Sequence, residues 1–337
     1  MCNKVKIVAE LSANHNGSIE TAIDTIKAAA RSGANAIKLQ TYKPDTITID
    51  SSKKDFIINN GSIWDGDNFY NLYKKAHTPW EWHPKLYEVA KSEGIECFST
   101  PFDKTAVDFL EELNNPIYKI ASFEITDIPL IDYVASKGKP IILSTGIATY
   151  SDIELAIDTC KKRKNYDITL LKCTSSYPAP LQESNLTMIR EYRERFNLIT
   201  GLSDHTIGST APMVATALGA KIIEKHFILD RSIGGPDSSF SMDENEFSRM
   251  VKDIRNVEKV LGEVTYELTN KQKKGREFSR SLYVIKNVKK DDIINEENVK
   301  SIRPGFGMHP KYLKSIVGKK FNKDYHKGDR LNFDMIE

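Results

Sequence analysis

Short apolar runs alternate with amphipathic segments along most of the chain, from Val5 to about Leu261. Between the runs, apolar residues recur at spacings of three and four, as in residues 19–33, and this period predicts helices. Eight runs have the length and composition of buried strands: residues 5–13, 36–42, 96–102, 117–123, 140–146, 168–176, 198–206 and 221–229. Eight buried strands, each followed by a helix, predict an α/β fold of the (β/α)₈ type, a TIM barrel.

A doubly wound open sheet is the alternative fold, because it gives the same local pattern of strands and helices. A glycine-rich GxGxxG motif after the first strand would support that alternative. No such motif follows residues 5–13, so the pattern favours the closed barrel.

The alternation of strands and helices stops after Leu261. Residues 271–276 are polar and basic, which is typical of a solvated connector. Beyond them, short β-like runs separated by turn residues predict a small β-rich domain of about sixty residues. We therefore expect a barrel domain at residues 1–265, a linker at 266–278 and a small C-terminal domain at 279–337.

One connection, from Lys43 to Thr78, is unusually long for a strand-to-helix loop, and it contains Trp64, Phe69 and other aromatic residues. Loops that follow barrel strands lie at the rim where barrel active sites are built, which favours a lid or a substrate wall. A decorative insertion is the alternative, because surface loops tolerate insertions.

Composition narrows the class of partner. The chain has 48 basic and 46 acidic residues, a net charge of +2, so no global field favours nucleic acid and an anionic substrate must be attracted locally. The four cysteines are scattered without CxxC spacing, which indicates reduced thiols. No apolar run approaches the roughly 18 residues of a membrane helix. We expect a soluble, cytoplasmic protein with neither nucleic acid nor membrane as a partner.

Polar residues lie at the carboxyl ends of the predicted strands, where the catalytic groups of barrel enzymes are found. They are Glu10, Lys38, Gln40, Thr100, Lys119, Ser122, Glu124, Ser144, Ser175, Tyr177, Ser203, His205, Glu224 and His226. A buried lysine requires a counter-charge. For Lys38 and Lys119 it is either an internal carboxylate, from Glu10 or Glu124, or a bound anion. Two lysines surrounded by hydroxyl groups favour a phosphate.

His205 and His226 lie on consecutive predicted strands at the same end of the barrel. Two neutral imidazoles there could ligate one divalent metal ion and leave positions open for water and substrate. Side chains alternate in a strand, so Ser203 and His205 share one face, and Asp204 points the other way and is expected to be structural.

Nine segments resemble the sialic acid synthase family, the nonulosonic acid synthases: AELSANHNGS (9–18), IKLQTY (37–42), STPFD (99–103), YKIASFE (118–124), LSTG (143–146), CTSSYPAP (173–180), GLSDHT (201–206), EKHF (224–227) and GGPD (234–237). SANHNGS, WDG (64–66), TPWEWH (78–83) and CTSSYPAP are similar to its pseudaminic acid synthase branch. RPGFG (303–307) looks like part of the family's antifreeze-like (SAF) domain.

The resemblance implies an enzyme, a transferase of carbohydrate biosynthesis. Its reaction is the metal-dependent condensation of phosphoenolpyruvate with 2,4-diacetamido-2,4,6-trideoxy-L-altrose and water, which gives pseudaminic acid and phosphate by C–O cleavage. Two alternatives stay within the family, N-acetylneuraminate synthase and legionaminic acid synthase. An alternative of another class is a non-catalytic sugar-binding barrel.

The resemblance also implies roles for individual residues. His205 and His226 would bind the divalent cation, manganese with magnesium or cobalt as alternatives, and would be catalytic together with Glu10 and Glu124. Lysine and hydroxyl side chains would hold phosphoenolpyruvate: Lys38, Thr100, Lys119, Ser122, Ser144, Ser175 and Ser203. The sugar would contact Gln40, Tyr177, Asp237 and Arg303, the last entering from the partner chain of a domain-swapped homodimer.

Overall fold

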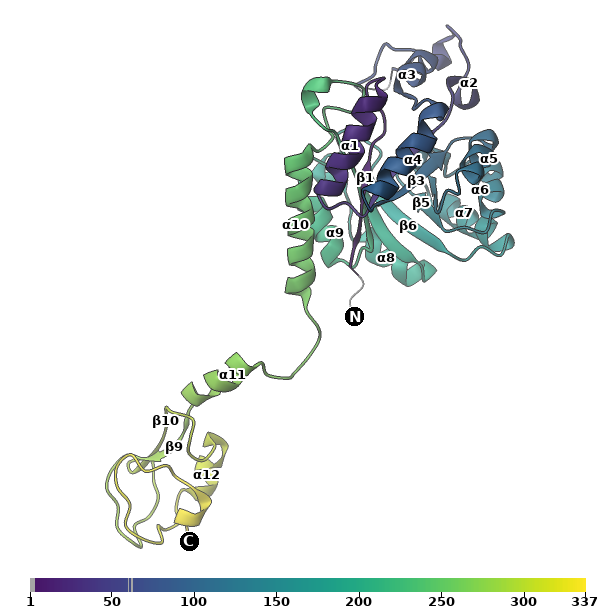
Figure 1. Ribbon diagram of the computed structural model, residues 1–337. Coiled ribbons are helices and arrows are strands. Elements are labelled where there is room, and N and C mark those ends of the chain that lie inside the picture. Colours follow the sequence, from purple (N-terminus) through teal and green to yellow (C-terminus); the bar gives the residue numbers. More distant parts are fainter. Residues whose placement is uncertain (1–3, 60, 62) are drawn as a thin grey trace. The chain divides into compact units, whose positions relative to one another are not determined.

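The computed structural model describes residues 4–59, 61 and 63–337. The chain divides into two compact units, Met1–Gly262 and Glu263–Glu337. In the first unit, which we call the barrel unit, strands β1 to β8 pair in parallel and in chain order to form a closed barrel (Figure 1). Their bounds are β1 Lys6–Glu10, β2 Ala36–Thr41, β3 Glu96–Pro101, β4 Tyr118–Ile120, β5 Ile141–Ser144, β6 Ile168–Cys173, β7 Ile199–Asp204 and β8 Ile222–His226. Each lies within one of the eight apolar runs, and the predicted barrel is confirmed.

Helices surround the barrel on the outside (Figure 1). The helices of this unit are α1 Ile19–Arg31, α2 Pro44–Ile47, α3 Phe69–Ala76, α4 His83–Ser92, α5 Lys104–Glu112, α6 Ile128–Ala135, α7 Tyr150–Lys162, α8 Met188–Phe196, α9 Thr210–Ala217 and α10 Glu244–Leu261, of which α2 and α3 belong to the long connection after β2 and lie beyond the end of the barrel. Helix α1 begins after Ser18, whose hydroxyl accepts a hydrogen bond from the amide of Thr21 at 3.1 Å. It is followed by Gly33, whose φ of +87° suits a helix C-terminus.

Apolar residues fill the interior of the barrel on the side nearer the amino ends of the strands. Val8, Ala36, Phe98, Ile142, Leu171 and Ile222 form one buried cluster. Two larger clusters pack the outward faces of the strands against the helices. Because side chains alternate along a strand, the residues two positions beyond the interior cluster also point inward, toward the carboxyl end of the barrel. These next positions are where the polar candidates lie.

The second unit contains a two-stranded antiparallel sheet of β9 Ser281–Val284 and β10 Val299–Ile302. Isolated bridges extend the pairing, and a core that includes Leu282, Val299 and Phe321 holds the unit together. Two short helices, α11 Asn270–Gly275 and α12 Leu313–Ile316, complete it. Helix α11 therefore lies within the segment expected to be a linker, where Thr269 caps its first turn.

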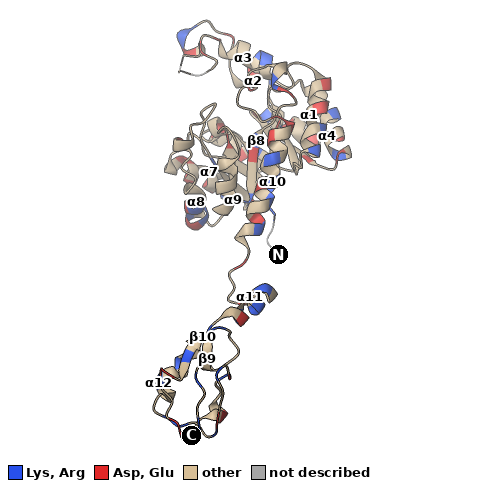
Figure 2. Ribbon diagram, turned by 90° about the vertical axis from the view of Figure 1, so that its left-hand side faces the viewer, with Lys and Arg blue, Asp and Glu red and all other residues tan. Residues whose placement is uncertain are grey.

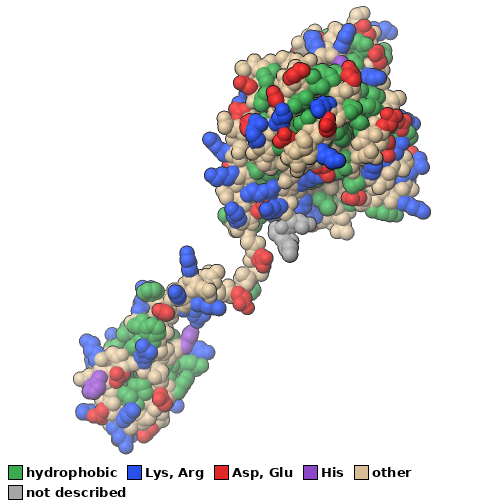
Figure 3. All heavy atoms as spheres, viewed as in Figure 1, with side chains coloured by type: hydrophobic (Ala, Val, Ile, Leu, Met, Phe, Trp, Pro, Cys, Tyr) green, Lys and Arg blue, Asp and Glu red, His purple; other side chains and the backbone are tan. Residues whose placement is uncertain are grey.

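Basic and acidic residues are interspersed along the ribbon of the barrel unit (Figure 2), and their side chains are interspersed over the face that Figure 3 shows. In the part of the chain that the structure describes, no helix is long and apolar enough to cross a membrane. Cys97, Cys160 and Cys173 are buried and form no disulfide.

Candidate active site

The inward-facing positions change from apolar to polar toward the carboxyl end of the barrel. Glu10, Lys38 and Glu224 lie two residues beyond Val8, Ala36 and Ile222 of the interior cluster. Strand register places Glu10 opposite both Lys38 and His226, and Ser203 opposite Glu224. The barrel thus brings side chains from distant parts of the sequence into one layer.

Two lysines and two carboxylates form a buried ionic cluster in this layer. Lys38 Nζ lies 2.5 Å from Glu10 Oε2 and 3.6 Å from Glu224 Oε1. Lys119 Nζ lies 3.7 Å from Glu224 Oε1, and Ser203 Oγ donates a hydrogen bond to the same oxygen at 3.2 Å. The internal ion pair expected for Lys38 and Glu10 is present, whereas the carboxylate within 4 Å of Lys119 is that of Glu224, and Glu124 interacts with Lys119 only at longer range.

Burial and charge set the pKa values within this ionic cluster. Burial raises the pKa of Glu10 above its ordinary value, although Lys38 opposes this shift. Burial also lowers the pKa of Lys119, and Glu224 offsets this only in part. For Lys38, burial is outweighed by Glu10 and Glu224, so its pKa is raised. The two lysines are balanced by two carboxylates, and protonation of Glu10 would leave an excess of positive charge.

Hydroxyl groups converge beside this cluster around Gly146. The amide of Gly146 donates a hydrogen bond to Ser122 Oγ at 3.0 Å. A Cβ at this position would lie 2.0 Å from Ser175 Oγ and 2.7 Å from Ser122 Oγ, so no larger residue fits without displacing them. Ser144 Oγ, at the end of β5, is buried without a hydrogen-bond partner, and Thr100 Oγ1 accepts a hydrogen bond from Lys38 at 3.3 Å. We call Ser122, Gly146 and Ser175 the hydroxyl cradle.

The two histidines are adjacent, as expected from consecutive strands. The ring centroids of His205 and His226 are 5.3 Å apart. His205 Nδ1 lies 2.9 Å from the carbonyl oxygen of Thr174. If Nδ1 donates to this carbonyl, Nε2 faces away as a free ligand atom. His226 Nδ1 is buried without a hydrogen-bond partner and lies 3.8 Å from Asp237 Oδ2.

The electrostatics of the two rings differ. Burial, followed by the charge of His205, lowers the pKa of His226 well below its ordinary value, so this ring is neutral. Burial also lowers the pKa of His205, but Cys173 and the Thr174 carbonyl outweigh it and the net shift is upward. A divalent cation fits two such imidazoles, and at His205 it would compete with a proton. The described residues contain no group of three or more His, Cys, Asp or Glu placed to hold a metal ion, so protein ligands beyond this pair are not indicated.

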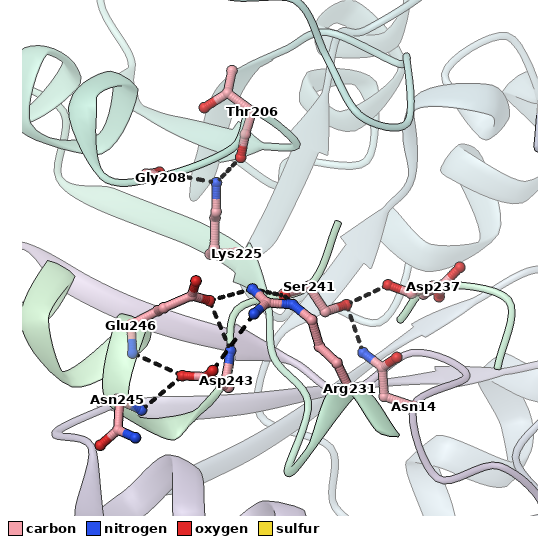
Figure 4. A network of polar contacts seen from close by, with 10 residues as sticks. All are labelled: Asn14, Thr206, Gly208, Lys225, Arg231, Asp237, Ser241, Asp243, Asn245 and Glu246. Carbon is pink, nitrogen blue, oxygen red and sulfur yellow. Dashed lines mark hydrogen bonds and ion pairs between the residues drawn. The ribbon is translucent and has the colours of Figure 1, made fainter. Parts of the chain in front are cut away.

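A hydrogen-bond network holds Asp237 (Figure 4), whose carboxylate lies 3.8 Å from His226 Nδ1. Ser241 Oγ donates to the Asp237 carbonyl at 2.6 Å and accepts from Asn14 Nδ2 at 2.8 Å. The Arg231 guanidinium donates to the Ser241 carbonyl at 2.9 Å and also pairs with Glu246 in the first turn of α10. Burial raises the pKa of the Asp237 carboxyl. The network joins the loops after β1 and β8 and fixes the Asp237 backbone.

Asp204 has the structural role expected from strand alternation. Its carboxylate lies 2.5 Å from Lys225 Nζ, and both side chains are buried on the outward face of the barrel wall. Lys225 also donates to the carbonyl oxygens of Thr206 and Gly208 (Figure 4). The ion pair stabilises the turn that carries His205.

A cavity of about 360 Å³ lies at the carboxyl end of the barrel. Gln40, Glu124, Tyr177, His226 and Asp237 line it on the barrel side. The long connection lines it as well, through Ile47, Ile58, Trp64, Phe69, Leu72, Tyr73 and Ala76; we call the first five of these the outer wall. The connection therefore lies at the cavity, and its role as a lid or a substrate wall stays a prediction.

Glu124 is the most unusual carboxyl group of the cavity. Burial raises its pKa to about 7, and Lys119 opposes the shift. Its Oε2 is buried without a hydrogen-bond partner. A carboxyl group with these properties can exchange a proton near neutral pH.

The remaining sugar-side candidates lie in different places. Gln40 Nε2 donates to Glu10 Oε1 at 3.0 Å and to Ser12 Oγ at 2.9 Å. The Tyr177 ring packs 4.4 Å from the His205 ring, centroid to centroid. Arg303 belongs to the second unit, where it is exposed directly after β10.

Glu224 is among the polar residues at strand ends that the sequence indicates, but no role was inferred for it, although it shares a strand face with His226 at a spacing of two. Two other residues of the site, Gly146 and Ser12, were missed as candidates from the sequence. Gly146 and Ser12 carry no such signal, because their importance depends on what approaches them in space.

Comparison with known proteins places this geometry in context. A family model described as the NeuB family matches residues 25–266. The chain is 50% identical over 328 residues to a pseudaminic acid synthase of Campylobacter jejuni, covering 97% of this chain and 95% of that protein. It is 48% identical over 338 residues to a pseudaminic acid synthase of Helicobacter pylori, covering 100% and 99%. The crystal structure of an N-acetylneuraminic acid synthetase from Leptospira borgpetersenii superimposes with a TM-score of 0.73 at 34% identity, covering 82% of this chain and 91% of that one.

Proposed function

The chain belongs to the NeuB family, and from this premise we propose that it condenses phosphoenolpyruvate with 2,4-diacetamido-2,4,6-trideoxy-L-altrose and water. The products are pseudaminic acid and inorganic phosphate. The observation that carries this proposal is the identity of 48% and 50% to pseudaminic acid synthases over nearly the whole chain. The buried ionic cluster, the hydroxyl cradle and the paired histidines support it at the level of chemistry.

We assign phosphoenolpyruvate to the lysines and hydroxyl groups of the barrel, Lys38, Thr100, Lys119, Ser122, Ser144, Ser175 and Ser203. Ser144 Oγ, which is buried without a partner, supports a ligand at this place, because buried polar atoms are rarely left unpaired. The ionic cluster is close to neutral as it stands. Uptake of a proton by Glu10, whose pKa is raised, would favour binding of the anion.

We assign a divalent cation, manganese in the first place, to His205 and His226. The neutral ring of His226 and its unpaired Nδ1 support this assignment. A cation bound there supplies Lewis-acid polarisation of a substrate oxygen. The network around Arg231 and Ser241 holds Asp237, and the Asp237 carboxylate would orient the His226 ring.

The reaction forms one carbon–carbon bond and breaks one carbon–oxygen bond. The methylene carbon of phosphoenolpyruvate attacks the sugar aldehyde, whose oxygen becomes a hydroxyl group by taking up a proton. Water adds to the second carbon of the former phosphoenolpyruvate and gives its proton to Glu124, whose pKa of about 7 suits a general base. The tetrahedral intermediate then loses phosphate through cleavage of its C–O bond. Its hydroxyl proton leaves with the phosphate as the keto group forms, and Glu124 passes the proton it took from water to the oxygen of the former aldehyde.

We further propose that the second unit is an antifreeze-like (SAF) domain, and that Arg303 reaches the sugar in the partner barrel of a domain-swapped homodimer. The sequence RPGFG and the small antiparallel sheet support this assignment. We place the enzyme in the cytoplasm, where buried free thiols such as Cys97 and Cys173 stay reduced.

A turnover assay that offers three sugars with phosphoenolpyruvate tests the substrate. Phosphate should be released from phosphoenolpyruvate far faster with 2,4-diacetamido-2,4,6-trideoxy-L-altrose than with N-acetylmannosamine or the legionaminic acid precursor. Preferential turnover of either competitor would replace this proposal by the corresponding synthase. Sugar binding without phosphate release would favour the non-catalytic barrel.

A further inference from the structure

The outer wall of the cavity is apolar and belongs to the long connection between β2 and α4. Its five residues, Ile47, Ile58, Trp64, Phe69 and Leu72, present hydrocarbon and aromatic surface to the cavity. Ile58 is almost completely buried, with 3% of its surface exposed. An aliphatic side chain offers no partner to a hydroxyl group, so an oxygen placed against this wall loses its hydrogen bonds to water.

The polar groups of the cavity come mainly from the barrel, which also contributes Phe102 and Phe123 to the lining, and from Tyr73 of the connection. Gln40, Glu124, His226 and Asp237 line the cavity, and Glu124 Oε2 and His226 Nδ1 are buried without hydrogen-bond partners. With its aldehyde carbon near His226 and its far end against the outer wall, a substrate would contact both groups of lining residues. The far end of the proposed sugar is its sixth carbon, a methyl group.

The structure holds the outer wall in place before any substrate binds. Trp64 Nε1 donates to the Pro236 carbonyl at 3.3 Å, and its ring lies 5.5 Å from that of Tyr177. Within the connection, the amide of Gly66 donates to the Ile58 carbonyl at 2.8 Å, and Asn68 caps α3 through the Tyr70 amide. A wall held by these contacts can discriminate between ligands, because a rearrangement that solvates an added oxygen would break them.

We propose that the outer wall determines sugar specificity by accepting the methyl end of the substrate and rejecting a hydroxyl group at the same carbon. This inference rests on the proposed function and adds to it the part of the structure that recognises the methyl group at the sixth carbon of the sugar. Apolar pockets reject an isostere with an added hydroxyl group by about a hundredfold. The wall is therefore expected to give a preference of about that size.

The test compares two sugars that differ by one oxygen atom: 2,4-diacetamido-2,4,6-trideoxy-L-altrose and its 6-hydroxy counterpart, 2,4-diacetamido-2,4-dideoxy-L-altrose. Phosphate release with phosphoenolpyruvate gives kcat/KM for each sugar with one enzyme preparation. The wild-type chain should prefer the deoxysugar by about a hundredfold. The double variant Ile47→Thr/Leu72→Asn, which replaces apolar wall groups by polar ones of similar shape, should reduce that preference to about tenfold or less.

A matched control carries the same substitutions away from the cavity. Ile49 and Leu155 are 59% and 47% exposed and do not line it, so Ile49→Thr/Leu155→Asn should keep the wild-type preference. The ratio of two sugars in one preparation is independent of the folded fraction, and the single variant Ile47→Thr provides a milder change if the double variant folds poorly.

The outcomes distinguish failure of the proposed role of the wall from failure of the proposed reaction. A preference that persists unchanged in both Ile47→Thr and the double variant, or that is absent in the wild type, overturns the role of the wall and leaves the proposed reaction intact. A wild-type enzyme that turns over neither sugar overturns the proposed reaction itself. A loss of preference in the wall variants, with the control unaffected, supports the wall.

Discussion

Lys38 Nζ lies 2.5 Å from Glu10 Oε2, with 5% and 1% of the two side chains exposed. A buried pair of this kind adds little net stability, because desolvation of both charges offsets their attraction. The pair instead places a cation and a carboxyl group with a raised pKa side by side at the carboxyl end of β1. The pair is therefore better suited to substrate binding than to holding the barrel together.

This view predicts the stability of variants of the pair. Lys38→Met removes the counter-charge of the buried Glu10 carboxylate and should lower the free energy of unfolding by about 3–5 kcal/mol. The double variant Lys38→Met/Glu10→Leu removes both charges and should recover most of that loss, while remaining inactive. Denaturant unfolding measures both, and equal stability of the single and double variants would contradict the argument.

The raised pKa of Glu124 predicts that, as the pH rises toward 7, turnover increases and the stability of the fold decreases. Its folded pKa of about 7 lies above the ordinary 4.5, so the folded state favours the protonated form. Its stabilising contribution is complete below pH 4.5 and is lost as the pH rises to about 7. Turnover, which needs the carboxylate as a base, should rise over the upper part of that range.

The variant Glu124→Gln separates these two effects. The variant should lose turnover, including the increase of turnover near pH 7. Its free energy of unfolding at pH 8 should exceed that of the wild type by up to about 3 kcal/mol. At pH 4.5 the two proteins should unfold alike. A Glu124→Gln variant that keeps the wild-type pH profile would remove Glu124 from the proton transfer.

The histidine pair predicts how metal and turnover depend on each other. His226→Ala should leave the thermal unfolding of the barrel nearly unchanged, abolish manganese binding measured by calorimetry and abolish turnover. His77→Ala, which changes a histidine that does not line the cavity, is the control and should bind metal and turn over normally. Full activity of His226→Ala in buffer treated with a chelator would exclude the metal assignment.

The hydroxyl cradle predicts a selective defect in phosphoenolpyruvate binding. In Gly146→Ala the new methyl group meets Ser175 Oγ and Ser122 Oγ at 2.0 and 2.7 Å, so both must move. The KM for phosphoenolpyruvate should rise at least tenfold, which corresponds to about 1.4 kcal/mol of binding free energy, with a smaller change for the sugar. Gly275→Ala, where a Cβ meets nothing within 4 Å, is the matched control. Equal changes in both KM values would indicate a general distortion of the barrel.

Much of the fold could be predicted because the barrel is built from local periodicity. Eight apolar runs give eight strands, and the period of two places Ser203 and His205 inside and Asp204 outside, as its ion pair with Lys225 confirms. The ion-pair partner of Lys119 could not be predicted in the same way. Strand β4 ends at Ile120, and Glu124 follows in a short 3₁₀ turn, Ser122–Glu124, which carries it away from the strand face.

Other parts of the site depend on contacts between distant segments. Asp237 faces His226 only because Ser241, Arg231 and Asn14 fix the loop after β8. The space beside Gly146 depends on where Ser122 and Ser175 meet, and each comes from a different loop. Neither relationship has a sequence period, so the structure was needed to find them.

The central claim, that this chain joins phosphoenolpyruvate to the deoxysugar with C–O cleavage, is tested most directly in water labelled with oxygen-18. The wild-type enzyme is incubated with manganese, phosphoenolpyruvate and 2,4-diacetamido-2,4,6-trideoxy-L-altrose, and the phosphate is analysed by mass spectrometry. The account predicts phosphate that is released only when the sugar is present and that carries no label from water. Labelled phosphate, or release without the sugar, would contradict it.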